Sequence, residues 1–323
     1  MKRNFFIVVA VQLLIILIIS WGFINRNTSI FTNPLKSDNL TSNTSEKFPN
    51  FYEPKPNSSE TASLKFMGAE YDYLVKYQIN SDGMNQLKNF PIKKERETFR
   101  IVTLGDSFTF GENVNTFENY PSVLQRILDK ECSSQTKFEV LNLGVSGYDI
   151  QYSIERLKNR GLKYEPDLVL WLVAVDQLSR VNRLTAEKSR GFLREMKSTE
   201  EGRKELEKKP YVYIVNAKNA VVNELGENNI LAMQERYLNE ISQYYDNPIL
   251  FFTFDGNRIK DSHKNLLTKI TSTNPNMFFY EKVPDIYKMD GVLPDFHPSS
   301  KGYQIIAEDV FNYLKDSNLI DCR

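Results

Sequence analysis

The sequence predicts an α/β fold in which about five parallel strands form one sheet between two layers of helices. Apolar runs of strand length alternate with segments of helical periodicity from residue 99 to residue 317. Residues 168–173 form an uninterrupted apolar run, which is typical of a strand buried on both faces of a parallel sheet. With 41% hydrophobic residues in a chain of 323, there is enough apolar surface for one sizeable core. Because parallel strands require crossover connections, helices should cover both faces of the sheet.

Short-range patterns predict the elements of this domain. The first strand runs over residues 100–104, and later apolar runs predict strands at residues 138–141, 168–173, 249–254 and 277–280. Three helices are predicted from apolar residues at helical spacing: Tyr120, Val123, Leu124, Ile127 and Leu128; Ile150, Ile154 and Leu157; Tyr303, Ile306, Val310 and Leu314. The last helix should be capped by Ser299 or Ser300. Residues 187–209 are dense in both charges and are interpreted as a solvated helix, with a substrate lid as the alternative.

The amino terminus carries a second strong signal, because residues 5–24 contain no charged side chain. As a helix they would span roughly 30 Å, the thickness of a bilayer core. We predict an uncleaved membrane anchor over residues 1–24. Lys2 and Arg3 should keep the amino terminus in the cytoplasm and place the rest of the chain outside it. A cleaved signal peptide, which would give a secreted protein, is the alternative.

Two segments separate this anchor from the main domain. Residues 25–62 are rich in Asn, Ser, Thr and Pro and predict a flexible linker. Residues 63–98 are predicted to form an accessory segment with one or two strands outside the main sheet, because residues 71–79 alternate and residues 80–83 resemble a turn. Cys132 and Cys322 suit either two buried thiols or one disulfide in an oxidising compartment. No Cys/His cluster has zinc-ligand spacing, so we predict no metal and no cofactor.

The first predicted strand ends directly in Gly105, Asp106 and Ser107, with no polar spacer. In open α/β sheets the ligand crevice lies at the carboxyl ends of the strands, so the Ser107 hydroxyl is positioned to attack a bound carbonyl. The alternative is that Ser107 caps the next helix.

Nucleophilic serine chemistry also needs an imidazole and a carboxylate that orients it. The chain has two histidines. His263 lies in a polar stretch that we interpret as a solvated helix start, which leaves His297 as the candidate base. Asp295 precedes His297 by two residues and would point to the same side of an extended segment. Asp295 could instead cap the following helix, and Asp290 is the fallback carboxylate.

These residues together resemble the GDSL or SGNH hydrolase superfamily over residues 98–315. Gly105, Asp106 and Ser107 resemble its first block, residues 142–147 with Gly147 resemble the second, and Asp295 with His297 resemble the last. The resemblance implies a flavodoxin-like SGNH hydrolase fold and an acyl-enzyme mechanism on Ser107, His297 and Asp295. It also implies an oxyanion hole that includes the backbone amides of Ser107 and Gly147.

The third block departs from the pattern of the superfamily, because Asp176 stands where an asparagine is usual. An amide donor at such a position is worth about 2.7–4 kcal/mol. An ionised carboxylate about 4 Å from the developing oxyanion would instead repel it by roughly 4 kcal/mol at an effective dielectric near 20. Asp176 is therefore either protonated and a donor, or turned away so that backbone amides act alone, or the mark of a weak site.

The functional prediction is an extracytoplasmic, membrane-tethered serine esterase that hydrolyses an acyl or acetyl ester. An acylated cell-envelope polysaccharide or a lipid is the candidate partner. The 41 basic and 41 acidic residues balance, so nothing points to nucleic acid. An O-acyltransferase that forms the same acyl-enzyme is one alternative. A noncatalytic carbohydrate-binding or assembly protein with a degenerate site is the other.

Overall fold

The computed structural model describes residues 41–43, 51–64, 73–132, 136–174, 176–253, 259–281 and 283–322. The predicted membrane anchor over residues 1–24 lies outside the described residues, as does most of the predicted linker. Among the helices that are described, none is long and apolar enough to cross a bilayer.

A five-stranded parallel sheet lies at the centre of the molecule, with the strand order β6-β5-β7-β8-β9. The strands are β5 (Thr98–Leu104), β6 (Lys137–Asn142), β7 (Leu168–Leu172), β8 (Ile249–Phe252) and β9 (Met277–Tyr280). Along β7, Val169 and Trp171 enter one core while Leu170 and Leu172 enter the other, as the two-residue period of a strand requires. The predicted fold class is confirmed, and the strand order is the flavodoxin-like one.

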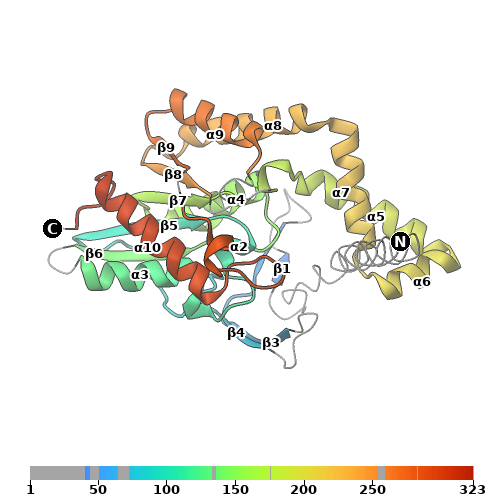
Figure 1. Ribbon diagram of the computed structural model, residues 1–323, viewed down its shortest axis with the longest axis horizontal. Helices are drawn as coiled ribbons and strands as arrows, with labels where there is room; N and C mark the ends of the chain where they lie inside the picture. The colour runs from blue at the N-terminus through green and yellow to red at the C-terminus, as the bar shows by residue number, and fades with distance from the viewer. Residues whose placement is uncertain are drawn as a thin grey trace, which may run out of the picture.

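Helices cover both faces of the sheet (Figure 1). On one face lie α3 (Tyr120–Glu131) and α10 (Ser300–Asp316); on the other lie α4 (Ile150–Arg156), α8 (Glu227–Glu240) and α9 (Asp261–Thr273). The predicted apolar stripes of α3 and α10 are the buried ones, and Ser299 caps α10 through the backbone N–H of Gly302. The sequence patterns therefore identified both the helices and the faces that they bury.

The charged segment after β7 forms helices that project from the sheet (Figure 1). They are α5 (Asn182–Ser198) and α6 (Glu200–Lys208), and the less charged α7 (Val212–Leu225) follows them. No side chain of α5 is buried. This arrangement agrees with the solvated-helix interpretation of residues 187–209.

The end of the predicted flexible linker differs from the prediction, because residues 52–54 and 58–62 lie in strands. The accessory strands are β1 (Thr41–Asn43), β2 (Tyr52–Pro54), β3 (Ser58–Leu64) and β4 (Tyr73–Ile79). β1 pairs with β2 and β3 pairs with β4, both antiparallel and both separate from the main sheet. Phe51 supplies the physical reason, since it is buried against the rings of Tyr148 and Tyr152. The polar composition of the segment concealed this aromatic anchor.

A buried ion pair also fastens these strands to the domain. The Glu53 carboxylate bonds the guanidinium groups of Arg156 and Arg160, the latter at 2.9 Å. Burial raises the pKa of Glu53, but the charges of the two arginines outweigh it and lower the value to about 2. Removing one partner of such a buried pair typically costs about 3–5 kcal/mol, so the accessory strands are an integral part of the fold.

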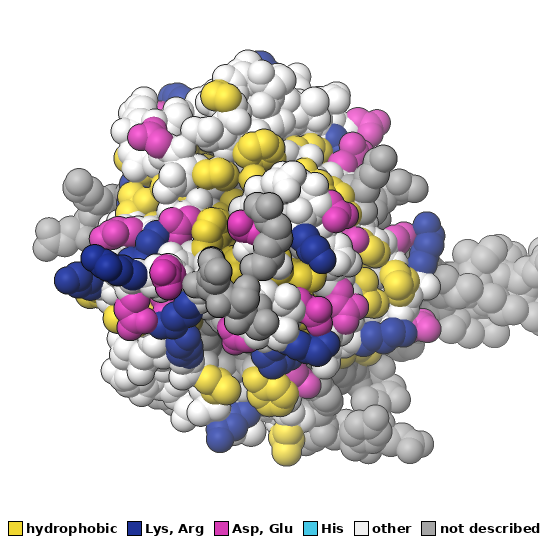
Figure 2. Space-filling model, turned by 90° about the vertical axis from the view of Figure 1, so that its left-hand side faces the viewer, with side chains coloured by type: hydrophobic (Ala, Val, Ile, Leu, Met, Phe, Trp, Pro, Cys, Tyr) yellow, Lys and Arg dark blue, Asp and Glu magenta, His cyan; other side chains and the backbone are white. Residues whose placement is uncertain are grey.

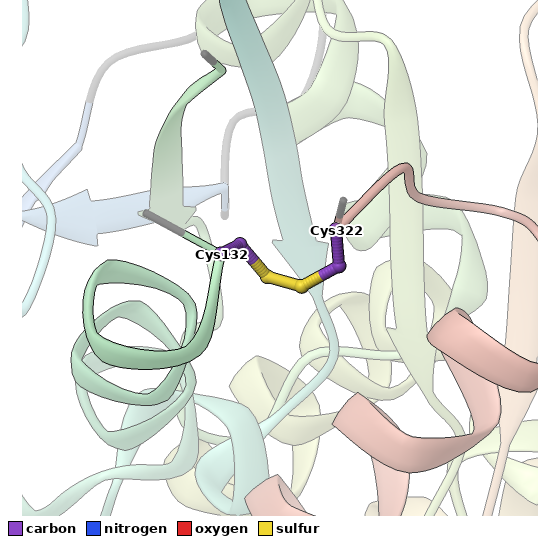
Figure 3. Close-up of a disulfide and its surroundings, with 2 residues drawn as sticks. All are labelled: Cys132 and Cys322. Atoms are coloured by element: carbon purple, nitrogen blue, oxygen red, sulfur yellow. A yellow bond between two sulfur atoms is a disulfide. The ribbon is translucent and has the colours of Figure 1, made fainter. Parts of the chain in front are cut away.

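A disulfide joins Cys132, at the end of α3, to Cys322, beyond α10 (Figure 3). The disulfide alternative of the sequence analysis is therefore the one that the structure contains.

On the surface, basic and acidic side chains are interspersed over the face drawn in Figure 2, in keeping with the equal counts of 41 each.

Candidate active site

Ser107 begins α2 (Ser107–Phe110), a single helical turn directly after β5. Gly105 makes this turn possible, because its φ is +146° and a Cβ there would lie 2.8 Å from the Leu172 carbonyl oxygen of the neighbouring strand. Asp106 caps the helix, since its carboxylate accepts a hydrogen bond from the Phe108 backbone N–H at 3.2 Å. The alternative role of Ser107 as the cap is wrong, and its hydroxyl points to another partner.

That partner is His297, which lies between Ser107 and Asp295. Its Nε2 is 2.9 Å from Ser107 Oγ, and its Nδ1 is 2.9 Å from Asp295 Oδ2. When Asp295 accepts the Nδ1 proton, the neutral ring keeps the Nε2 lone pair toward the hydroxyl, as a general base requires. Phe108 stacks on the imidazole with 4.8 Å between ring centroids. The three predicted residues form one hydrogen-bonded chain.

Asp295 and His297 are joined by a tight turn rather than by the expected extended segment. Phe296 between them is left-handed, with a φ of +70°. The Asp295 carboxylate serves both sides of the turn: Oδ1 accepts the His297 backbone N–H at 3.2 Å, and Oδ2 faces the ring. A left-handed residue other than glycine costs roughly 1–3 kcal/mol, and such strain is often found at functional sites.

Two residues that the sequence analysis did not identify contact Asp295 and His297. Both lie just after α2 in the chain. Asn113, at φ +66°, donates a short hydrogen bond from Nδ2 to Asp295, and its backbone N–H donates to the Tyr77 hydroxyl at 2.8 Å. The Glu112 carboxylate lies 3.9 Å from His297 Nε2, and its side chain is 10% exposed. Glu112 faces the imidazole and Asn113 bonds the carboxylate that orients it, yet no periodicity or motif in the sequence distinguishes the two residues from an ordinary loop.

The carboxylates of Asp295 and Glu112 favour the charged form of the His297 imidazole. Burial lowers the pKa of His297, but the hydrogen bond to Asp295 and the charge of Glu112 outweigh it, so the pKa rises from 6.5 to about 9. Burial is also the main reason that the pKa of Glu112 is raised. For Asp295, burial is outweighed by the hydrogen bond and charge of His297, which lower its pKa.

The second sequence block lies beside α2. Buried Asn142 donates to the Phe110 carbonyl at 3.3 Å and accepts the Gly144 N–H at 3.0 Å, which fixes this loop against the Ser107 turn. Gly147 is left-handed at φ +81°, and a Cβ there would meet an aromatic hydroxyl at 2.8 Å. Within the described ranges, the backbone N–H groups of Ser107 and Gly147 have no hydrogen-bond acceptor. Both amides are available to a ligand oxygen.

Asp176 is held by two cations. Arg180 donates to its two oxygens at 2.5 and 3.0 Å, and Lys218 Nζ lies 3.2 Å from Oδ2. Burial raises the pKa of Asp176, but these two charges outweigh it and hold the value well below its usual range. An ionised carboxylate has no proton to donate, so the contacts with Arg180 and Lys218 disfavour the first of the three alternatives, a protonated Asp176 that donates in an oxyanion hole.

Arg180 links Asp176 to the Ser107 turn. Its Nη1 lies 3.0 Å from Asp106 Oδ2 and 3.3 Å from the Tyr148 carbonyl oxygen. Burial raises the pKa of Asp106 to about 6, although Arg180 opposes the shift. Arg180 follows Asp176 by four residues, a spacing at which helical side chains meet, so the sequence did contain a signal for this pair.

The remaining candidates lie elsewhere. His263 is fully buried in α9, with Nε2 3.1 Å from Ser179 Oγ and 3.9 Å from Glu227. The predicted helix start is confirmed, because His263 lies in the first turn of α9, but the prediction that it is solvated is wrong, because α9 packs against α8. Asp290, the fallback carboxylate, ends a one-turn helix in a left-handed conformation, and Asp295 takes the contact with His297.

Comparison with known proteins gives matches among solved structures only. No protein-family model matches the chain, and the search of curated proteins found no match. A two-domain esterase active on acetylated mannans, crystallised with mannopentaose, is 16% identical with a TM-score of 0.42; the match covers 69% of this chain and 51% of the other. This chain thus spans about half the length of that esterase.

Two shorter proteins match over nearly their whole length. The psychrotrophic esterase EstA from Pseudoalteromonas is 16% identical with a TM-score of 0.43, over 68% of this chain and 99% of that one. A catalytic mutant of an acetylxylan esterase from Geobacillus stearothermophilus is 13% identical with a TM-score of 0.41, over 70% and 97%. At these identities and TM-scores the matches carry no argument about the reaction. A lipolytic protein of the G-D-S-L family from Desulfitobacterium hafniense is also among the matches, at 16% identity and a TM-score of 0.36, over 66% of this chain and 98% of that one.

Proposed function

We propose that this protein is a serine esterase that cleaves acyl or acetyl esters through an acyl-enzyme on Ser107. The observation that carries the proposal is the hydrogen-bonded chain of Ser107, His297 and Asp295, with 2.9 Å at each contact of the imidazole. A nucleophile, a base and an orienting carboxylate in hydrogen-bond reach are what acyl transfer requires. A noncatalytic protein would have no need of this alignment.

In the first half of the reaction, Ser107 Oγ attacks the ester carbonyl carbon while His297 Nε2 takes the hydroxyl proton. The tetrahedral intermediate then collapses, the bond to the alcohol oxygen breaks, and His297 returns the proton to that oxygen. The acyl group remains on Ser107. Asp295 holds the ring in the required tautomer and stabilises the imidazolium that forms.

The backbone amides of Ser107 and Gly147 would stabilise the developing oxyanion. Both lie without an acceptor in the described part of the chain. Asp176 takes no part as a donor in this scheme, because Arg180 and Lys218 hold it as a carboxylate. Loss of one amide donor costs about 10²–10³ in rate in comparable sites, so hydrolysis should be slower than in a site with a third donor.

We further propose that the catalytic domain works outside the cytoplasm, tethered by residues 5–24, on an acylated cell-envelope polysaccharide. The Cys132–Cys322 disulfide supports an oxidising compartment. The full chain should fractionate with membranes and resist extraction by salt. Recovery of a mature protein that begins near Asn27 would instead mean cleavage and secretion.

Labelling with a fluorophosphonate tests the esterase proposal directly, because the reagent modifies an activated serine. Full-length protein should be labelled, and Ser107→Ala should not. Denatured wild-type protein is the control for nonspecific reaction. Equal labelling of Ser107→Ala, or no labelling of folded wild type, would refute the proposed function.

A further inference from the structure

Among the residues that the structure describes, Glu112 is a buried carboxylate that approaches the reacting nitrogen of His297. Its Oε2 lies 3.9 Å from Nε2, the atom that also faces Ser107 Oγ at 2.9 Å. Its backbone N–H donates to the Ser107 carbonyl at 3.0 Å, so the two residues are fixed to one another by the α2 turn. The mechanism above gives this carboxylate no role.

The distance of 3.9 Å between Oε2 and Nε2 is too long for a direct hydrogen bond but suits one bridging oxygen. If a bridging oxygen lies about 2.8 Å from each atom, the angle Oε2···O···Nε2 is about 90°. This angle is near the one between the two O–H bonds of water. Once Ser107 is acylated, its oxygen has no proton, and Nε2 is free to face the next hydroxyl. The position between the two residues is where an attacking acceptor must lie.

We propose that Glu112 binds the acceptor that attacks the acyl-enzyme. This inference rests on the proposed function and specifies its second half. One O–H of the acceptor points to His297 Nε2 and a second donor of the same molecule points to Glu112. The acceptor oxygen attacks the acyl carbon, His297 takes the first proton, the bond from the acyl carbon to Ser107 Oγ breaks, and Ser107 regains that proton from His297.

The chemistry of the acceptor follows from this requirement for two donors. Water satisfies it with its two protons, and a 1,2-diol of a sugar satisfies it with neighbouring hydroxyls. A simple alcohol has one proton, which His297 must receive, so it offers buried Glu112 no donor beyond the Ser146 hydroxyl that already bonds this carboxylate. Such a mismatch is penalised strongly in a buried site.

The test measures how the acetyl-enzyme formed from p-nitrophenyl acetate divides between methanol and ethylene glycol at equal hydroxyl concentration. Wild-type protein should favour the glycol by about tenfold, the factor expected for one hydrogen bond to a charged group. Glu112→Met should abolish the preference, and Glu112→Gln, which keeps a neutral acceptor, should lie between them. The rate of fluorophosphonate labelling reports acylation separately, and the partition does not depend on it, because both transfers start from the same acetyl-enzyme.

Glu118→Gln is the matched control, since Glu118 lies in the same loop but caps Asn115 instead of facing His297. Charges also act on His297 from Asp295 and Asp106, and on Glu112 from Arg180, so each protein is measured at the plateau of its own pH profile. An unchanged partition in Glu112→Met, or an equal loss of labelling and of both transfers, would overturn the inference. Failure of wild type to be labelled would instead refute the esterase proposal itself.

Discussion

Two groups of residues beside Ser107 hold their carboxylates in different ways. One group, the His297 side, is His297 with Asp295 and Glu112, and the other, the Asp176 side, is Asp176 with Arg180 and Lys218. On the first side, Asp295 and Glu112 both face one imidazole and raise its pKa to about 9. On the second, Asp176 lies between Arg180 and Lys218, which keep it ionised. Beside His297 a carboxylate supports the catalytic base, whereas at Asp176 its negative charge is balanced by two cations. The effect of a carboxylate on this reaction is therefore set by its partner rather than by its distance from the serine.

The largest expected effect comes from removing the imidazole. His297→Ala should lower kcat by roughly 10⁴-fold or more, because the nucleophile loses its base. His263→Gln should lower the melting temperature, since the residue is fully buried, but should leave kcat within about threefold. Steady-state hydrolysis of p-nitrophenyl acetate and thermal unfolding separate the two effects. A reversed result would mean that the two histidines had been assigned the wrong roles.

The pH dependence should be the next largest effect. His297 must be neutral to act as a base, so kcat/KM should rise with pH by about 50-fold between pH 7 and pH 9 and should level off above pH 9, because the pKa is about 9. Glu112→Gln removes one of the charges that stabilise the imidazolium, so the rise should shift to lower pH. A flat profile over this range would show that the imidazole is already neutral at pH 7.

The same pKa makes a matching prediction for stability. The pKa of His297 is raised on folding from 6.5 to about 9, so its contribution is fully present below about pH 6.5 and is lost as pH rises through 9. The size is roughly 3 kcal/mol at most. The free energy of unfolding should therefore fall over the range in which activity rises. In His297→Ala this part of the pH dependence should disappear; its persistence would point to another group.

Substitution of Asn113 tests whether catalysis depends on the hydrogen bond that this amide donates to Asp295. Asn113→Gly removes the amide that bonds Asp295 but tolerates the φ of +66° at this position. We expect kcat to fall about tenfold with KM unchanged, the size of one hydrogen bond to a charged group. Asn113→Ala should show the same rate but lower stability, because alanine resists the left-handed conformation. A change in KM alone would assign Asn113 to substrate binding.

The two sides also differ in how much of them could be predicted from sequence. The strands and the helical stripes follow from local patterns that a parallel sheet requires, and the Ser107, Asp295 and His297 positions follow from short motifs and the needs of serine chemistry. Glu112, Asn113 and the Tyr77 hydroxyl that holds Asn113 meet only through tertiary packing of α2 against β4, far apart in the chain. The left-handed turn at Phe296 is likewise invisible in a pattern of residue types. Asp176 departs visibly from the superfamily pattern, but its charge state also depends on Lys218, 42 positions away.

The smallest expected effect is that of Asp176→Asn, and it is the sharpest test of the comparison. If Asp176 repelled the oxyanion, removing its charge would speed hydrolysis by about the 10²–10³-fold associated with one oxyanion-hole donor. Because Arg180 and Lys218 already neutralise it, we expect kcat/KM to stay within about threefold at every pH. Stability should fall by on the order of 1 kcal/mol, since the pair is partly exposed to solvent. Lys218→Met is the matched control, because it weakens the same cluster without altering the Asp176 position. A large gain in Asp176→Asn would mean that the two cations do not screen the carboxylate. A large loss with folding intact would give Asp176 a direct role in the reaction, and the two sides of Ser107 would then be alike in depending on a carboxylate.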